Sequence, residues 1–220
     1  MFQDRIKFHY IHIEKMREAI SNILEKLEEQ SSLEKTRKVD IPQQDRMLAI
    51  TKETGELLNM ILRLKNAKNM LEVGTSAGYS TIWCAEAISE NSGKIITIEQ
   101  NPDKIKRAND NFQKAEIADN IIIKEGAAIN ILKKLNIKVK NQNFFDFVLI
   151  DADKENIIEY FDLILPMVAI GGVIITDNML YPEKYRQEMK KLSNHIKKNP
   201  KVRTTTSPVG NGEEITIKIK

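Results

Sequence analysis

The chain has 220 residues, which suits one α/β domain with a buried sheet, and its composition of 41% hydrophobic and 30% charged residues excludes disordered and fibrous proteins. Its net charge of +3 is the small difference between 34 basic and 31 acidic side chains, so charge does not mark it as a nucleic-acid-binding protein. No apolar run approaches the roughly 20 residues that span a bilayer, so we expect no membrane partner.

The N-terminal part of the chain, residues 1–65, is predicted to be helical. Its apolar residues recur at helical spacing in two runs, which contain Ile20, Ile23, Leu24 and Leu27, and then Leu57, Leu58, Ile61 and Leu62. Between the runs lies SSLEKTRKVDIPQQD, which is polar and contains a proline. Such a segment predicts a loop, and we expect that it can cover or uncover a site.

From residue 66 to residue 220 short β-type runs alternate with longer helical runs, as in the strand-helix-strand units of a parallel sheet. The predicted strands are 69–73, 94–99, 120–124, 145–151 and 172–177. The predicted helices are 80–89, 102–115, 127–135 and 154–167.

Two of these strands, FDFVLID and GVIITD, are apolar on both faces, as strands covered by helices on both sides should be. The tail VRTTTSPVGNGEEITIKIK instead joins two β-rich runs by a turn without a helix, which predicts a closing antiparallel hairpin. The fold class is therefore α/β, with a doubly wound, Rossmann-like core at residues 66–220. Together with the N-terminal helices it forms a single predicted domain, 1–220.

The cellular compartment is predicted from the cysteine content and from the N-terminus. A single cysteine, Cys84, cannot form an internal disulfide, and the first residues lack the apolar core of a signal peptide. Both features predict a cytoplasmic protein. Because Ile82 and Trp83 precede Cys84, we expect its thiol to be packed in the core rather than catalytic.

A candidate nucleoside site follows the first strand, in LEVGTSAGYS, where Gly74 and Gly78 allow a sharp turn and a ligand close to the backbone. The dinucleotide fingerprint would need glycines where this chain has Ser76 and Tyr79, which weakens a nicotinamide interpretation. The next strand ends at Glu99, where a carboxylate can accept both hydrogen bonds of a ribose diol. In the alternative, the glycines only allow tight packing and Glu99 caps a helix.

Two later strands end in oxygen-rich clusters, one with Asp151, Asp153 and Lys154 and the other with Asp177 and Asn178. Ligands of a doubly wound sheet collect at the carboxyl ends of its strands, so the two clusters can face one pocket. Two carboxylates and an amide oxygen suit Mg²⁺ first, and Mn²⁺ or Ca²⁺ as well. The alternatives are that Asp153 and Asp177 only cap helices or turns, and that Lys154 is a surface lysine.

Five ordered motifs, LEVGTSAGYS, IEQNPDKIKRANDN, EGAA, IDADK and GGVIITDNML, resemble those of the cation-dependent O-methyltransferases, the family of the caffeoyl-CoA and catechol O-methyltransferases. The resemblance runs from about Ile50 to the C-terminus. It implies a seven-stranded, mostly parallel sheet with an antiparallel last strand. It also implies S-adenosylmethionine as methyl donor and a homodimeric assembly.

The resemblance assigns roles by position. Cofactor-binding positions are Glu72, Gly74, Ser76, Tyr79, Ser80, Glu99, Gln100, Gly126, Ala127 and Asp151, of which Glu99 would hold the ribose and Gly126 with Ala127 would border the adenine. Metal ligands would be Asp151, Asp177 and Asn178, and the catalytic residues Lys154, as general base or stabilising charge, and Asp151. The family often has a polar residue or proline where this chain has Ala127, which leaves the adenine-side contact to backbone groups.

The sequence thus predicts a metal-dependent O-methyltransferase for a hydroxylated acceptor, with a catechol-like small molecule favoured because vicinal hydroxyls can chelate the metal. Methylation of hydroxyuridine in tRNA, known for bacterial relatives, is an alternative. A nicotinamide-dependent oxidoreductase and a noncatalytic nucleotide-binding protein are alternatives of other classes. Acceptor-binding residues are expected from the N-terminal helices and from the segments after Asp151 and Asn178, including Tyr181.

Overall fold

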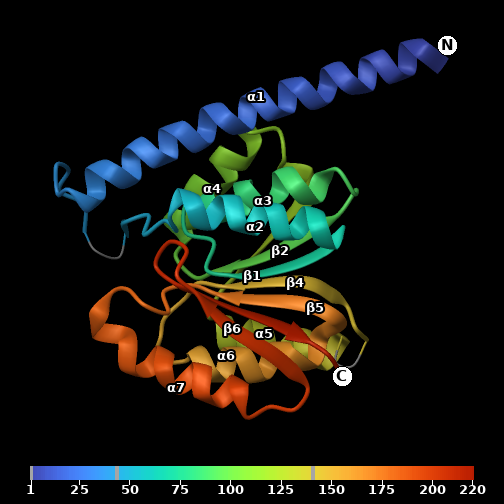
Figure 1. The fold of residues 1–220 in the computed structure, drawn as a ribbon. Coiled ribbons are helices and arrows are strands. Elements are labelled where there is room, and N and C mark those ends of the chain that lie inside the picture. The colour runs from blue at the N-terminus through green and yellow to red at the C-terminus, as the bar shows by residue number, and fades with distance from the viewer. Residues whose placement is uncertain (1, 43–44, 140–141) are drawn as a thin grey trace.

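A computed structural model describes residues 2–42, 45–139 and 142–220, with side chains described from residue 16 onward. Its strands and helices alternate along the chain after two N-terminal helices (Figure 1). The strands are β1 (Asn69–Val73), β2 (Lys94–Glu99), β3 (Ile121–Glu125), β4 (Phe145–Ile150), β5 (Val168–Thr176), β6 (Val202–Ser207) and β7 (Glu213–Lys218). The α-helices are α1 (Phe2–Lys35), α2 (Lys52–Lys65), α3 (Tyr79–Ser89), α4 (Pro102–Lys114), α5 (Ala128–Val139), α6 (Ile157–Ile164) and α7 (Arg186–Lys197).

The strands form one seven-stranded sheet in the order β3-β2-β1-β4-β5-β7-β6. Strands β1 to β5 are parallel, whereas β7 runs antiparallel to both of its neighbours, β5 and β6. The predicted sheet with an antiparallel last strand is therefore confirmed. Because the strand order reverses beside β1, the carboxyl ends of β1, β2, β4 and β5 surround the place where ligands of such sheets bind.

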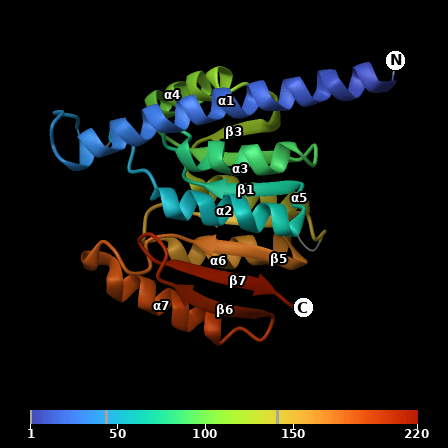
Figure 2. The ribbon, with the colours of Figure 1, turned by 45° about the horizontal axis from the view of Figure 1, so that its top comes forward.

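Helices cover both faces of the sheet, with α1 to α4 on one side and α5 to α7 on the other (Figures 1 and 2). Neighbouring strand residues enter different cores because successive side chains point to opposite faces. Met70 packs with the α1–α4 side, whereas Leu71 packs with the α5–α7 side. Both are fully buried, which is why the strands are apolar on both faces.

The N-terminal helices form where the apolar spacing predicts them. Ile20 and Leu27 of α1 and Leu58 of α2 are buried in the same core as Cys84 of α3, which confirms the prediction of a packed thiol. Helix α2 begins after Thr51, whose hydroxyl accepts a hydrogen bond from the amide of Thr54, 3.2 Å away. None of the helices in the described part of the chain combines the length and apolar character needed to cross a membrane.

Several predicted boundaries were wrong. Residues 31–35 of the predicted loop form the end of α1, and its residues 43–44 lie outside the described residues. Strand β5 begins at Val168 rather than Gly172, and the predicted helix 154–167 is shorter, since its ordered part is α6 followed by a 3-10 turn at Leu165–Met167. Helix α7, which begins within a charged stretch, was not predicted as an element.

Candidate active site

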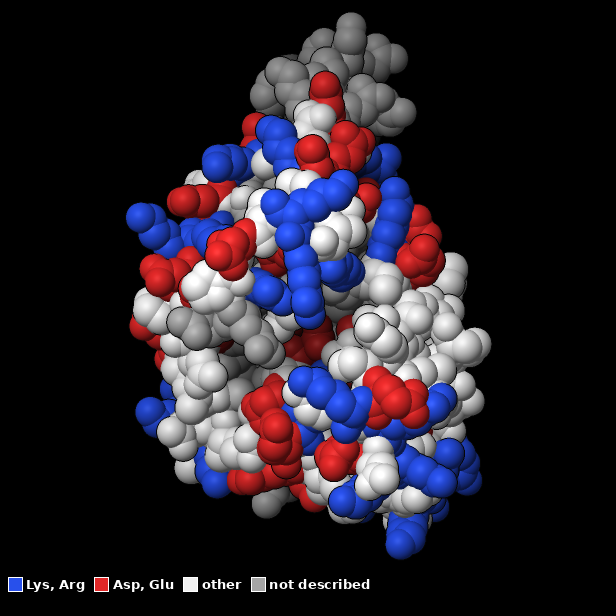
Figure 3. All heavy atoms as spheres, turned by 90° about the vertical axis from the view of Figure 1, so that its left-hand side faces the viewer, with Lys and Arg blue, Asp and Glu red and all other residues white. Residues whose placement is uncertain are grey.

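The carboxyl ends of β1, β4 and β5 meet at one edge of the sheet, and the chain after each strand stays bonded to its neighbour. The amide of Asp151 donates to the carbonyl of Val73 at 2.9 Å, and the amide of Asp177 to that of Ile150 at 3.2 Å. Seen from this side, the surface is hollowed, with Asp and Glu atoms at its bottom and Lys and Arg side chains across its rim (Figure 3). The two oxygen-rich clusters therefore lie next to one another at this edge of the sheet.

The loop after β1 approaches the chain after β4 so closely that only glycine fits at its start. Gly74 has a φ of +104°, and a Cβ atom there would lie 2.0 Å from the carbonyl oxygen of Asp151. Gly78, at a φ of +88°, precedes the first residue of α3. The predicted reason for both glycines, a sharp turn with close backbone approach, is confirmed at Gly74.

Glu72 supports this loop from below. Its side chain is fully buried, and its two carboxylate oxygens accept hydrogen bonds from the hydroxyls of Ser80, Thr81 and Thr97 at 2.6, 2.5 and 2.6 Å. Burial raises the pKa of this carboxyl, while the three hydroxyl donors oppose the shift. In this arrangement Glu72 fixes the base of the loop and holds Ser80 in place.

The Glu99 carboxylate joins the loop to the end of β2. It accepts hydrogen bonds from the amides of Ser76, Gln100 and Asn101 at 2.8, 2.9 and 3.0 Å. The amide of Gly126 also donates to the Glu99 carbonyl, at 2.9 Å. Gly126, the candidate for the adenine side, therefore lies next to Glu99, the candidate for the ribose side. A carboxylate has about four acceptor positions, so three amides leave capacity for a ribose hydroxyl.

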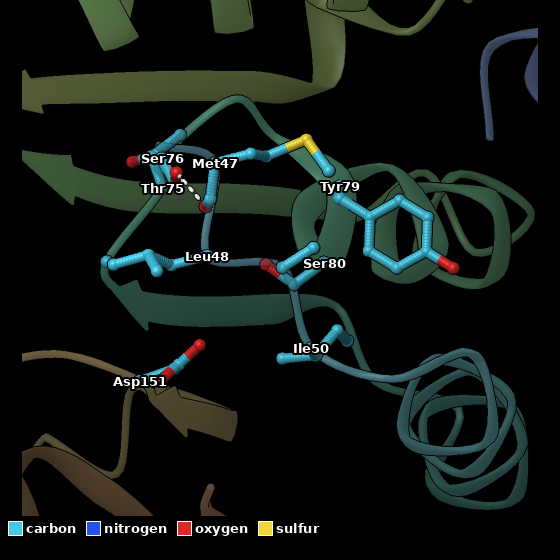
Figure 4. A pocket seen from close by; sticks show the side chains of 10 residues that line it. Met47, Leu48, Ile50, Thr75, Ser76, Tyr79, Ser80 and Asp151 are labelled. Atoms are coloured by element: carbon cyan, nitrogen blue, oxygen red, sulfur yellow. Dashed lines mark hydrogen bonds between the residues drawn. The ribbon is translucent and has the colours of Figure 1, made fainter. Parts of the chain in front are cut away.

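A small cavity lies between the loop and the segment that precedes α2 (Figure 4). It is lined by Met47, Leu48, Ala49, Ile50, Gly74, Thr75, Ser76, Tyr79, Ser80 and Asp151. Its volume of about 10 Å³ has room for about one water molecule, far less than a nucleoside needs. The segment is held closed, because the Ser76 hydroxyl donates to the Met47 carbonyl and the Met47 amide donates to Glu34 at 2.7 Å.

The predicted metal ligands lie together at the ends of β4 and β5. Asn178, in the left-handed region at a φ of +70°, donates from its side-chain amide to Asp177 at 3.1 Å. The Lys154 ammonium lies 3.3 Å from a carboxylate oxygen of Asp151. Lys154 is only 6% exposed, so the alternative of a surface lysine is wrong.

A third carboxylate, that of Glu213, lies beside Asp177. Burial, followed in importance by the charge of Asp151, raises the pKa of Asp177 to about 7. Burial and the charge of Asp177 raise the pKa of Glu213 to about 10. Two acids buried this close therefore hold on to protons, which a divalent cation would displace on binding.

The donor chemistry fits a hard divalent cation, since Asp151, Asp177 and Asn178 offer only oxygen ligands. Within the described ranges, no three Asp, Glu, His or Cys side chains already converge as a metal site. The three predicted ligands are two carboxylates and one amide. A bound cation would draw them together, and its positive charge would offset the repulsion between the two carboxylates.

The remaining predicted residues lie in three different places. Tyr79 lines the cavity and donates through its hydroxyl to Glu28 at 2.8 Å, and burial raises its pKa. Gln100 and Ala127 are exposed at the outer edge of the site. Asp153 points away from the cluster, because it accepts from the amide of Asn156 at 3.1 Å and from the hydroxyl of Tyr160, which confirms the capping alternative for this residue.

Two parts of the site were not predicted. The Met47–Ile50 segment carries no motif, and only its place beside the loop shows its role. Glu213 lies in the tail, where GNGEEI was interpreted as turn and strand. A pair of acidic residues at the start of a β-run was the one available signal.

Comparison with known proteins supports the resemblance. The model of the O-methyltransferase family matches residues 23–219. Caffeoyl-CoA O-methyltransferase 1 of Arabidopsis thaliana is 31% identical over 206 residues, which cover 87% of this chain and 79% of that protein. Caffeoyl-CoA O-methyltransferase 5 of Nicotiana tabacum is 32% identical over 199 residues, covering 84% and 82%.

Solved structures agree with these relatives. An O-methyltransferase from Bacillus cereus in complex with SAH has a TM-score of 0.74 at 26% identity and covers 90% of each chain. TomG, an O-methyltransferase of tomaymycin synthesis from Streptomyces achromogenes in complex with SAM, has a TM-score of 0.74 at 27% identity and covers 92% of this chain and 90% of its own. The comparisons give no support to an oxidoreductase or a noncatalytic protein. The chain belongs to the S-adenosylmethionine-dependent O-methyltransferases, in the family of caffeoyl-CoA O-methyltransferase.

Proposed function

We propose that this enzyme transfers the methyl group of S-adenosylmethionine to a hydroxyl of a catechol-like small molecule and needs a divalent cation, Mg²⁺ first. One observation carries the proposal: Asp151, Asp177 and Asn178 lie at the same edge of the sheet as the glycine loop and Glu99. A cofactor site and an oxygen-rich site would thus lie side by side at this edge.

The cofactor-binding residues would act through the loop. Gly74 lets the methionine part lie against the backbone, Ser76 and Ser80 offer hydroxyls, and Tyr79 closes the cavity wall. Glu99 accepts from the ribose hydroxyls, and Gly126 with Ala127 borders the adenine. Structural relatives that hold SAH or SAM support this placement.

The metal would be held by Asp151, Asp177 and Asn178. When bound, a divalent cation supplies a positive charge that orients a hydroxylated acceptor and lowers the pKa of its hydroxyl. The carboxylates of Asp151 and Asp177 and the side-chain amide oxygen of Asn178 would supply the hard oxygen ligands.

Lys154 is proposed as the catalytic residue that receives the hydroxyl proton or stabilises the oxygen after deprotonation. Its ammonium is buried beside Asp151, which fixes the side chain 3.3 Å from the carboxylate. A neutral lysine could take the proton, and a charged one would face the negative oxygen. Methyl transfer is then a single displacement, assisted chiefly by alignment and electrostatics.

The acceptor class rests on two features. Vicinal hydroxyls can bind one cation through both oxygens, and relatives in the family are named for caffeoyl-CoA. The basic rim of the hollow would also tolerate a phosphorylated acceptor, which keeps tRNA as the second acceptor to test (Figure 3). Tyr181, 64% exposed, lies in the segment after Asn178 where acceptor contacts are expected.

Calorimetric titration with S-adenosylmethionine and with NAD, followed by methyl-transfer assays on a catechol and on bulk tRNA, tests the proposal. We expect S-adenosylmethionine to bind, NAD not to bind, and the catechol to be methylated. Methylation of tRNA but not of the catechol would show that the acceptor is tRNA. Binding of NAD alone would contradict the proposed activity. A homodimer in the cytoplasm stays a prediction, and sedimentation analysis tests the dimer.

A further inference from the structure

Glu213 and Asp177 lie on neighbouring strand ends, and the pairing of these strands places their carboxyl groups together. In the antiparallel pair of β5 and β7, Thr176 is opposite Glu214. One residue further along, at the end of β5 and the start of β7, Asp177 is opposite Glu213. Side chains that are directly opposite in such a pair lie on the same face and close to one another, and like charges there are destabilising.

The contacts of Glu213 with the described residues leave one of its two carboxyl oxygens buried without a partner. The residue is fully buried, and its Oε1 accepts a hydrogen bond from the hydroxyl of Thr54 in α2 at 2.8 Å. Its Oε2 is buried, and no donor in the described part of the chain reaches it. A hydrogen bond between the carboxyl groups of Glu213 and Asp177 needs a proton on one of the two acids, and a bound cation would take the place of that proton.

An unsatisfied carboxylate oxygen is costly in a protein interior unless a cation or a donor faces it. Lys154, the nearby cation described above, is engaged by Asp151. We propose that Glu213 belongs to the divalent-cation site as a third carboxylate, whose negative charge raises the affinity of the site for the cation. This inference rests on the proposed function and adds a residue to the three ligands of the resemblance.

Glu214 provides a matched control within the same strand. It is equally buried, but successive side chains of a strand point to opposite faces. Its carboxylate accepts from the hydroxyls of Ser193, Thr204 and Thr206, on the side of α7. A general effect of removing a buried negative charge from β7 should therefore appear in both variants, whereas an effect on the cation site should appear only at Glu213.

The experiment measures Mn²⁺ binding to the purified protein by electron paramagnetic resonance of free Mn²⁺, without any acceptor or methyl donor. We expect Glu213→Gln to weaken Mn²⁺ binding about tenfold or more, because a unit charge close to a divalent cation is lost while the side-chain shape is kept. Glu213→Asp should lie closer to the wild type, Glu214→Gln should equal it, and Asp177→Asn should bind least.

Thermal unfolding with and without Mn²⁺ gives a second measurement and checks the fold. Without the cation, Glu213→Gln should unfold near the wild-type temperature, because the amide keeps the shape of the side chain and can still accept the hydrogen bond from Thr54. With Mn²⁺ its melting temperature should rise less than that of the wild type. Equal Mn²⁺ affinities for the wild type and Glu213→Gln, with Asp177→Asn impaired, would overturn the role of Glu213 alone. A wild type that binds no Mn²⁺ would overturn the cation site altogether.

Discussion

Glu72, which is buried beneath the loop after β1, makes the stability of the protein depend on pH. Its pKa is raised above the value of an unfolded chain, so the native state keeps its proton to higher pH than the unfolded state does. Stability from this group is complete below the unfolded pKa and is lost as pH rises through the folded pKa. The hydroxyls of Ser80, Thr81 and Thr97 donate to this carboxyl and oppose the rise in its pKa.

We therefore predict that Glu72→Gln alters the pH dependence of unfolding. Its free energy of unfolding, measured in urea at pH 5 and pH 8, should fall less with rising pH than that of the wild type, because the amide does not ionise. Parallel pH profiles for the two proteins would show that burial does not shift this carboxyl.

Glu99 carries a second prediction at the residue scale. Glu99→Ala should weaken S-adenosylmethionine binding by roughly 1 to 3 kcal/mol, the range of a hydrogen bond to a charged group together with the cost of the unpaired ribose hydroxyl. Asp110→Ala, an exposed acid on α4, serves as control. Calorimetry that gives the same affinity for wild type and Glu99→Ala would mean that the ribose binds elsewhere.

Single residues at strand ends were predictable because a doubly wound sheet gathers them at one edge, and Asp151, Asp177 and Glu99 all lie there. Glu213 was not, because its importance depends on which residue lies opposite in the antiparallel pair. The spacing of residues within the β6–β7 hairpin does not determine which residue of β5 lies opposite a given residue of β7. The side chain of Lys154 was likewise predictable in position but not in its burial.

At the scale of elements, the segment before α2 closes the cavity to about the volume of one water molecule. We therefore predict that the Met47–Ile50 segment moves to admit the cofactor, so that a smaller fraction of open molecules means a lower apparent affinity. Glu34 holds the segment closed by accepting from the Met47 amide, and it pairs with Arg107 at 3.9 Å.

Glu34→Ala should thus speed the association of S-adenosylmethionine by a few-fold in stopped-flow measurements, because a closing contact is lost. Glu29→Ala, an exposed residue on the same helix, should leave the rate unchanged. Identical association rates for all three proteins would mean that the segment does not limit entry.

Elements with strong apolar periodicity were predicted well, and those dominated by charge were not. Helix α7 was not among the predicted helices, because charged and polar residues dominate it, yet Met189, Leu192 and Ile196 are buried on one face. The start of β5 was missed because Gly171 and Gly172 resemble a turn, whereas the strand continues through them from Val168.

At the scale of the whole molecule, alternating strands and helices determine the doubly wound sheet, and the helix-free tail places β7 antiparallel beside β5. This topology brings residues from distant parts of the chain together, as in the hydrogen bond from Thr54 to Glu213, which lie 159 residues apart in the sequence. Acceptor choice could not be predicted, because it depends on the shape of the rim rather than on any motif.

The central claim is that methyl transfer depends on a divalent cation held by Asp151 and Asp177. Methyl transfer from S-adenosylmethionine to a catechol, measured with Mg²⁺ and with EDTA, tests it most directly, alongside Asp151→Ala and Asp177→Ala. The predicted result is activity that EDTA removes and Mg²⁺ restores, with both variants folded but inactive. Undiminished activity in EDTA and in both variants would contradict the claim.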